Sequence, residues 1–244
     1  MGVLDGRVAI VTGAARGQGL AEAERFVAEG ASVVLVDRLG EQGKAAAGGL
    51  GTAARFVCGD VAAEQTWAQA VDTATGEFGG LDILVNNAGV MVSRGLVDTD
   101  EATFRDVLDT NLVGAFLGIR AVVPAMRARG GGAIVNTASA AGIKAIPMGS
   151  AYVASKFGLR GLSRAAALEL GRDQIRVNCV CPGLVRTEMA ADMLRYHERE
   201  ALSHIPLGFA AEATDVADLV LFLVSDASRV ITGGEYLIDG GSIA

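Results

Sequence analysis

Short apolar runs alternate with longer amphipathic segments along this 244-residue chain, and this alternation constrains the fold more than any other feature. Seven runs are almost continuous in Val, Ile, Leu and Ala, as expected of strands that helices cover on both faces. These candidate strands lie at 7–12, 32–37, 54–58, 81–86, 133–137, 175–181 and 235–238. Helical patterns separate them near 18–29, 41–49, 63–78, 100–127, 151–171 and 213–225.

Strand–helix alternation from end to end predicts parallel strands joined by right-handed crossovers. We therefore expect an α/β chain with a single-domain Rossmann fold: a doubly wound, seven-stranded parallel sheet with helices on both faces. No linker or repeat interrupts the pattern, so residues 1–244 should form one domain. A loop at 90–98 and an insertion at about 183–208 break the rhythm. Both follow strands, where ligands bind in such sheets, and we expect 184–208 to form a lid.

Composition excludes several classes of function. A net charge of −7 argues against nucleic-acid binding, which needs a basic surface. Three cysteines and two histidines without metal-ligand spacing argue against a disulfide framework or a zinc site, and Cys179 and Cys181 should lie together in a buried strand. We find no apolar stretch that approaches the roughly 18 residues of a membrane span. The first apolar run is too short for a signal peptide, so the sequence predicts a cytoplasmic protein.

A glycine-rich turn follows the first candidate strand. Gly13, Gly17 and Gly19 follow the spacing Gly-x-x-x-Gly-x-Gly, with Arg16 and Gln18 between them. Glycines allow the backbone to turn tightly and approach a pyrophosphate, whose charge the N–H groups of the next helix can meet. A glycine-rich turn can also be purely structural, but its place between the first strand and the first helix favours a dinucleotide site.

The second strand ends at Asp37, 18 positions beyond Gly19. A carboxylate at this place accepts hydrogen bonds from the adenosine ribose, whereas the 2′-phosphate of NADP would bring like charges together. Asp37 therefore favours NAD. Arg16 and Arg38 favour NADP, because both could bind the 2′-phosphate. Either arginine can equally be a solvated surface charge.

Polar turns follow the next two strands at the same edge of the sheet. Asp60-Val61 comes after the third strand, and Asn87-Ala88-Gly89 comes after the fourth. The Asp60 side chain could meet the adenine amino group, and the Asn-Ala-Gly turn could brace the sheet or approach a ribose. Taken alone, each is better read as a helix cap or a turn.

Tyr152 and Lys156 lie four residues apart in a helical pattern, so their side chains share one face. A free tyrosine has a pKa of about 10, and bringing it near 7 requires roughly 4 kcal/mol in favour of the phenolate. A nearby ammonium together with a positive nicotinamide ring could supply this. Ser139 lies 13 residues before Tyr152, and two hydroxyls converging on one substrate oxygen suit hydride transfer to a carbonyl.

These motifs together resemble the short-chain dehydrogenase/reductase family. The resemblance rests on 12–19, Asp60, 86–89, Asn111, Ser139, Tyr152-x-x-x-Lys156 and Pro182-Gly183-x-x-x-Thr187, and extends to the terminal Asp239-Gly240-Gly241. It covers essentially the whole chain, and seven motifs in register are highly specific. Within the family, the chain is most similar to bacterial hydroxysteroid dehydrogenases and acyl-carrier-protein reductases.

The resemblance implies a catalytic tetrad of Asn111, Ser139, Tyr152 and Lys156. Tyr152 would exchange the proton, Ser139 would hold the carbonyl, Lys156 would bind the nicotinamide ribose and lower the tyrosine pKa, and Asn111 would kink its helix and hold a relay water. It also implies a homotetramer. The expected cofactor contacts are Gly13, Arg16, Gly17, Gln18, Gly19, Asp37, Arg38, Asp60, Val61, Asn87, Ala88, Gly89, Tyr152, Lys156, Pro182, Gly183, Val185 and Thr187.

Three functions remain open at this point. The first is an NAD-dependent dehydrogenase of an apolar secondary alcohol, such as a hydroxysteroid-like one. The second is an NADPH-dependent 3-oxoacyl-thioester reductase, which Asp37 disfavours. The third is a dinucleotide-binding sensor without turnover, which an intact tetrad disfavours. An apolar substrate is favoured by the lid and by the segment after the fifth strand. Their apolar residues, which could also simply pack against the body, are Met189, Met193, Leu194, Tyr196, Ile143, Ile146, Pro147 and Met148.

Overall fold

A computed structural model, which describes residues 2–244, has at its centre a seven-stranded sheet in which every pair of neighbours is parallel. The strand order is β3-β2-β1-β4-β5-β6-β7, which confirms the doubly wound Rossmann fold. The strands are β1 (Val8–Thr12), β2 (Ser32–Asp37), β3 (Ala54–Cys58), β4 (Ile83–Asn86), β5 (Gly132–Thr137), β6 (Ile175–Pro182) and β7 (Glu235–Ile238).

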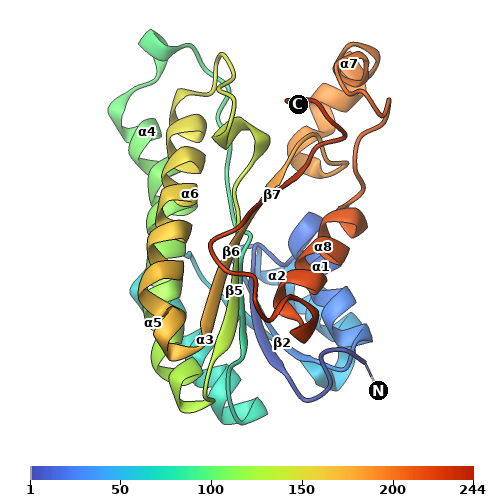
Figure 1. Cartoon of the computed structure of the whole chain (residues 1–244). Helices are drawn as coiled ribbons and strands as arrows, with labels where there is room; N and C mark the ends of the chain where they lie inside the picture. The colour runs from blue at the N-terminus through green and yellow to red at the C-terminus, as the bar shows by residue number, and fades with distance from the viewer. Residues whose placement is uncertain (1) are drawn as a thin grey trace.

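Helices cover both faces of this sheet (Figure 1). One face carries α1 (Gly17–Ala28), α2 (Gly40–Leu50) and α8 (Ala213–Val224). The other carries α3 (Glu64–Phe78), α4 (Glu101–Leu108), α5 (Gly114–Ala128) and α6 (Ser150–Leu170). A further helix, α7 (Ala191–Ser203), stands apart from both layers near the C-terminus.

Alternate residues of each central strand feed two separate cores. In β1, Ala9 and Val11 pack with the α1–α8 layer, while Val8 and Ile10 pack with the α3–α5 layer. All four side chains are buried, because a strand between two helical layers has no face left for solvent. This is why the strand sequences are continuously apolar and not alternating.

The helix expected at 100–127 is not continuous. A π-helical turn, Asp109–Val113, separates α4 from α5 and contains the buried Asn111. Such turns are rare and are frequent at functional sites. The break fits the kink that the family resemblance placed at Asn111.

The same segment bears on the membrane prediction. The helical run Glu101–Ala128 contains an 18-residue window with a mean hydropathy of 1.4, and by length and composition it could cross a membrane. The expectation that no segment would meet these two criteria was therefore wrong. Half of that window is buried inside the fold. The run is therefore accounted for as a core helix, packed against α3, α6 and the sheet.

The insertion after β6 contains a helix that the sequence did not predict. α7 has no buried residue and is irregular at His197 (φ −134°, ψ 20°). Cys179 and Cys181 are both fully buried in β6, as predicted.

Candidate active site

The strand order reverses between β1 and β4, so the crevice beyond their carboxyl ends is where an open α/β sheet binds ligands. The glycine turn leaves β1 at this place. Gly13 (φ +64°) and Gly17 (φ +59°) adopt the left-handed conformation that favours glycine. A Cβ at Gly19 would lie 2.4 Å from the Gly13 carbonyl oxygen, so the turn closes tightly enough to exclude any side chain there.

Thr12 and Asn87 tie the glycine turn to the end of β4. The Thr12 hydroxyl accepts hydrogen bonds from the backbone N–H groups of Asn87 and Ala88, each at 3.0 Å. The Asn87 side chain donates to the Thr12 carbonyl at 3.0 Å. The Asn-Ala-Gly turn therefore braces the sheet, one of the two roles considered for it, and Thr12 is a site residue that the sequence analysis had not singled out.

Asp37 lies against the glycine turn. Its carboxylate accepts hydrogen bonds from the N–H groups of Ala15 and Leu39, both at 3.0 Å, which fixes it between the turn and the start of α2. Arg16 and Arg38 are exposed, and within residues 2–244 neither forms an ion pair. The carboxylate of Asp37 and the guanidinium groups of Arg16 and Arg38 therefore lie at the same end of the crevice.

Asp60 and Val61 occupy the more distant turn after β3. The Asp60 carboxylate is exposed and accepts a hydrogen bond from Ala62 N–H at 2.9 Å, as in a turn. The carbonyl oxygen of the buried Val61 accepts a hydrogen bond from the Trp67 indole at 2.8 Å. No hydrogen bond joins Asp60 to the glycine turn in the described part of the chain.

Tyr152 is buried near the start of α6, with 8% of its surface exposed. Burial raises the pKa of the phenol above 10, while a hydrogen bond with the Ser139 side chain acts in the opposite direction. The Ser139 hydroxyl also accepts a hydrogen bond from Ala141 N–H at 3.1 Å and lies 3.5 Å from the Pro182 carbonyl. The two hydroxyls predicted to act together are therefore brought together.

Lys156 is 3% exposed and donates a hydrogen bond from Nζ to the Thr137 carbonyl at 2.7 Å. Burial lowers the pKa of this lysine to about 8. Nζ lies 5.6 Å from the centre of the Tyr152 ring, but the ammonium is not among the causes that shift the tyrosine pKa. Burial of the phenol dominates the pKa of Tyr152 in the chain alone, and its lowering by Lys156 together with a nicotinamide ring stays a prediction.

Asn111 is fixed by the backbone of Val90. Its side-chain oxygen accepts from Val90 N–H at 2.8 Å, and its amide donates to the Val90 carbonyl at 2.9 Å and to the Ser155 hydroxyl at 3.0 Å. A Cβ at Gly89 would lie 3.4 Å from both Asn111 Oδ1 and Lys156 Nζ. Gly89 therefore packs against both the Asn111 side chain of the π-helical turn and the Lys156 ammonium group. The sequence carried no signal for Val90 or Ser155.

The segment after β6 closes the other side of the crevice. Gly183 packs against Asp239, where a Cβ would be 2.7 Å from the aspartate Cβ, and Val185 is buried. The Thr187 methyl lies within 3.6 Å of where a Gly17 Cβ would stand. The predicted contacts after β6 and those of the glycine turn therefore meet across the crevice.

A family model described as enoyl-(acyl carrier protein) reductase matches residues 13–242. A 3-alpha-(or 20-beta)-hydroxysteroid dehydrogenase of Mycobacterium tuberculosis is 46% identical over 243 residues, covering 100% of this chain and 92% of that protein. The chain belongs to the short-chain dehydrogenase/reductase family. Members of this family use a nicotinamide dinucleotide, and the tight, side-chain-free glycine turn fits one.

Other short-chain dehydrogenase/reductase relatives vary in substrate and cofactor. A trans-4-hydroxycyclohexanecarboxylate dehydrogenase of Sinomonas cyclohexanicum is 42% identical, covering 98% of this chain and 93% of that protein. An NADP-dependent (R)-specific alcohol dehydrogenase of Lentilactobacillus kefiri is 39% identical, covering 99% and 98%. The crystal structure of a family member from Mycobacterium marinum superposes with a TM-score of 0.94 at 35% identity, covering 99% and 97%.

The loops around the tyrosine end of this short-chain dehydrogenase/reductase differ in how well they are packed. Arg94 N–H donates to the Met148 carbonyl at 2.8 Å, so the 90–98 loop lies beside the segment before Tyr152. Met148 and Ile146 are exposed, as are Met189 and Met193 near the start of the insertion. Between about two fifths and just over half of each of these apolar side chains is exposed.

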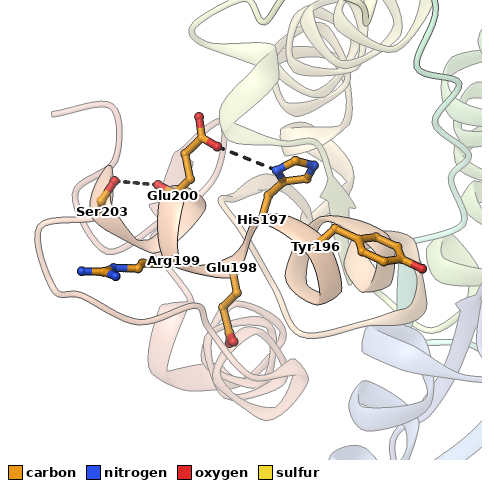
Figure 2. A pocket seen from close by; sticks show the side chains of 6 residues that line it. All are labelled: Tyr196, His197, Glu198, Arg199, Glu200 and Ser203. Carbon is orange, nitrogen blue, oxygen red and sulfur yellow. Dashed lines mark hydrogen bonds and ion pairs between the residues drawn. The ribbon is translucent and has the colours of Figure 1, made fainter.

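An open hollow of about 440 Å³ lies on α7 itself, and Figure 2 shows its lining. It is lined mainly by polar side chains, namely Tyr196, His197, Glu198, Arg199, Glu200 and Ser203. His197 Nδ1 lies 3.8 Å from a Glu200 carboxylate oxygen (Figure 2). Of the apolar residues predicted to face a substrate, only Tyr196 belongs to this hollow, so it is not the predicted substrate pocket.

Proposed function

We propose that the chain is an NAD(H)-dependent oxidoreductase that interconverts an apolar secondary alcohol, of hydroxysteroid type, and its ketone. One observation carries the proposal. Tyr152 is buried close enough to the Ser139 hydroxyl for that group to influence its pKa, and it lies beside Lys156, next to a glycine turn at the point where the strand order reverses. The hydroxysteroid and cyclic-alcohol relatives support the same reaction class.

The protein's own groups divide the work as follows. Tyr152 gives a proton to the carbonyl oxygen in reduction and removes it from the alcohol in oxidation. Ser139 holds that oxygen by a second hydrogen bond and stabilises the alkoxide charge that builds up on it. The bound dinucleotide supplies or accepts the hydride.

Lys156 and Asn111 hold the site in place. Lys156 is fixed by the Thr137 carbonyl, so its remaining N–H groups are free for the ribose of the dinucleotide. Asn111, in its π-helical turn, clamps the Val90 backbone and so positions Gly89 against the lysine. We assign the pyrophosphate to the turn at 13–19, and the nicotinamide carboxamide to Thr187 and the Val185 backbone.

The preference for NAD over NADP rests on Asp37. Its carboxylate cannot swing away from a bound ribose without breaking the hydrogen bonds to Ala15 and Leu39, so a 2′-phosphate would meet a fixed negative charge. Arg16 and Arg38, which form no ion pair within residues 2–244, favour NADP, and one relative at 39% identity is described as NADP-dependent. Asp37→Asn keeps one acceptor oxygen and removes the charge, so the NADP Michaelis constant should fall. An unchanged NADP Michaelis constant would count against this role.

The segment at 184–208 serves as the lid of this single domain. Its exposed Met189 and Met193, together with the exposed Ile146 and Met148 before Tyr152, provide apolar, adaptable side chains for a steroid-like substrate. Exposed apolar side chains on the outer faces of α5 and α6, including Phe116 and Phe157, support assembly into a homotetramer. We place the enzyme in the cytoplasm.

The test is a panel of hydroxysteroids and cyclic and open-chain secondary alcohols, followed by reduced-nicotinamide absorbance with both NAD and NADP. Tyr152→Phe should remove nearly all turnover while NADH still binds, because it deletes the proton donor and leaves the nucleotide contacts. Tyr236→Phe, a tyrosine of β7 that packs in the α1–α8 core, is the matched control and should remain active.

Two outcomes of the panel would reverse the proposal. Preferential NADPH-dependent reduction of 3-oxoacyl thioesters would favour the second candidate. Tight NADH binding without turnover of any substrate would favour a dinucleotide sensor.

A further inference from the structure

Glu22 occupies a position in α1 where a helix normally buries an apolar side chain. The inward stripe of α1 consists of Gly19, Glu22, Ala23 and Phe26, and Glu22 is 0% exposed. Within residues 2–244 neither of its carboxylate oxygens has a hydrogen-bond partner. A buried, unpartnered carboxyl group is costly, so its presence calls for a role.

Gln18 lies one helical turn before Glu22 and is in the glycine turn. Residues four apart on a helix have Cβ atoms about 5–6 Å apart, which is within reach of these two side chains after a change of rotamer. The side-chain oxygen of Gln18 is also buried and without a partner. Two orphaned polar groups on one helix face therefore adjoin the pyrophosphate end of the crevice.

Other charged groups near α1 already have partners. The charged residues of the elements packed on α1 are Asp37 of β2, Glu41 and Lys44 of α2, and Asp215 and Asp218 of α8. Asp37 binds backbone N–H groups, Glu41 pairs with Lys44, Asp215 caps α8 and Asp218 binds Arg25. Burial is accordingly the only cause that raises the pKa of Glu22, to about 8.

We propose that Glu22 is a positioning residue that sets the direction of the Gln18 side-chain amide and thereby tunes dinucleotide affinity. A protonated carboxyl donates its O–H to the Gln18 oxygen, which turns the Gln18 NH₂ group toward the crevice, where it can meet a phosphate. An ionised carboxylate instead accepts from that NH₂ group, which turns the amide oxygen toward the crevice. Affinity should therefore fall as Glu22 ionises.

This inference rests on the proposed function, because it requires a dinucleotide at the glycine turn. The experiment measures the Kd of NADH and of NADPH by nucleotide fluorescence at about pH 7 and about pH 9, for the wild type and Glu22→Gln. Glutamine has nearly the same shape and offers a donor at every pH. Lys156 also loses its proton between these pH values, but it does so in both proteins. The difference between the two pH profiles of Kd therefore reports the contribution of Glu22.

We expect the wild-type Kd to rise between these pH values roughly two- to tenfold more than that of Glu22→Gln, the equivalent of one hydrogen bond. In a Gln18→Leu background, which has no amide to orient, Glu22→Gln should leave the pH profile unchanged. Circular dichroism of each variant checks that it is folded.

Two results would overturn the inference while leaving the proposed function intact. One is a Glu22→Gln profile identical to the wild type, and the other is an effect of Glu22→Gln that persists in the Gln18→Leu background. Failure of the folded wild type to bind either nucleotide at any pH would instead overturn the proposed function, and this inference with it.

Discussion

Replacement of Glu22 by glutamine should stabilise the folded protein by an amount that grows with pH. The pKa of Glu22 is raised from 4.5 to about 8 in the folded state, so between these values the folded state binds more protons than the unfolded state. The stability that this proton contributes is complete below pH 4.5 and is lost as pH rises to about 8. At about 1.4 kcal/mol per pKa unit, the loss is about 3 kcal/mol at pH 7 and about 5 kcal/mol above pH 8.

The measurement is urea unfolding followed by circular dichroism at several values from pH 5 to pH 9, at one protein concentration because assembly would also affect stability. Glu22→Gln should match the wild type near pH 5 and exceed it by about 3 kcal/mol at pH 7. Glu24→Gln, which removes an exposed carboxylate from the same helix, is the matched control and should show no such divergence. A difference between Glu22→Gln and wild type that stays constant with pH would refute the reasoning.

Two further predictions concern the crevice. Gly19→Ala should weaken NADH binding at least tenfold in a titration, because the new Cβ would lie 2.4 Å from the Gly13 carbonyl and force the turn open; wild-type affinity would mean that the turn does not hold the pyrophosphate. The ionisation of Tyr152 can be followed as the ultraviolet phenolate absorbance of the wild type minus that of Tyr152→Phe. Without dinucleotide this signal should not appear below pH 10, and with NAD bound it should appear at a lower pH. An early signal without NAD would show that Lys156 alone is sufficient.

The sequence predicted the sheet well because its strands carry a redundant signal. In β1 every residue from Val8 to Val11 is apolar. Each one packs into one of the two cores, because helices cover the strand on both faces. Such runs fix both the number of strands and the parallel arrangement. α7 was not predicted: it has no buried residue, so no core contact constrains it, and its helical conformation is interrupted at His197.

The candidate site was predictable in its positions but not in its electrostatics. Spacing along one helix places Tyr152 and Lys156 on the same face, and strand ends place Asp37 and Gly89 at one edge of the sheet. Spacing does not give the depth of burial. Burial raises the pKa of Tyr152 and lowers that of Lys156, so the chain by itself opposes the phenolate that the sequence argument required. The missing stabilisation must come from what binds in the crevice.

The stability of the protein and its cofactor affinity are linked through the same proton on Glu22. If protonation of Glu22 favours dinucleotide binding by some factor, then bound dinucleotide must raise the pKa of Glu22 by the same factor, and a tenfold effect corresponds to about one pKa unit. The stability difference between the wild type and Glu22→Gln should level off at about pH 8 without NADH. With saturating NADH it should level off at a higher pH, toward about 9. If that pH is the same with and without NADH, Glu22 does not control the orientation of Gln18.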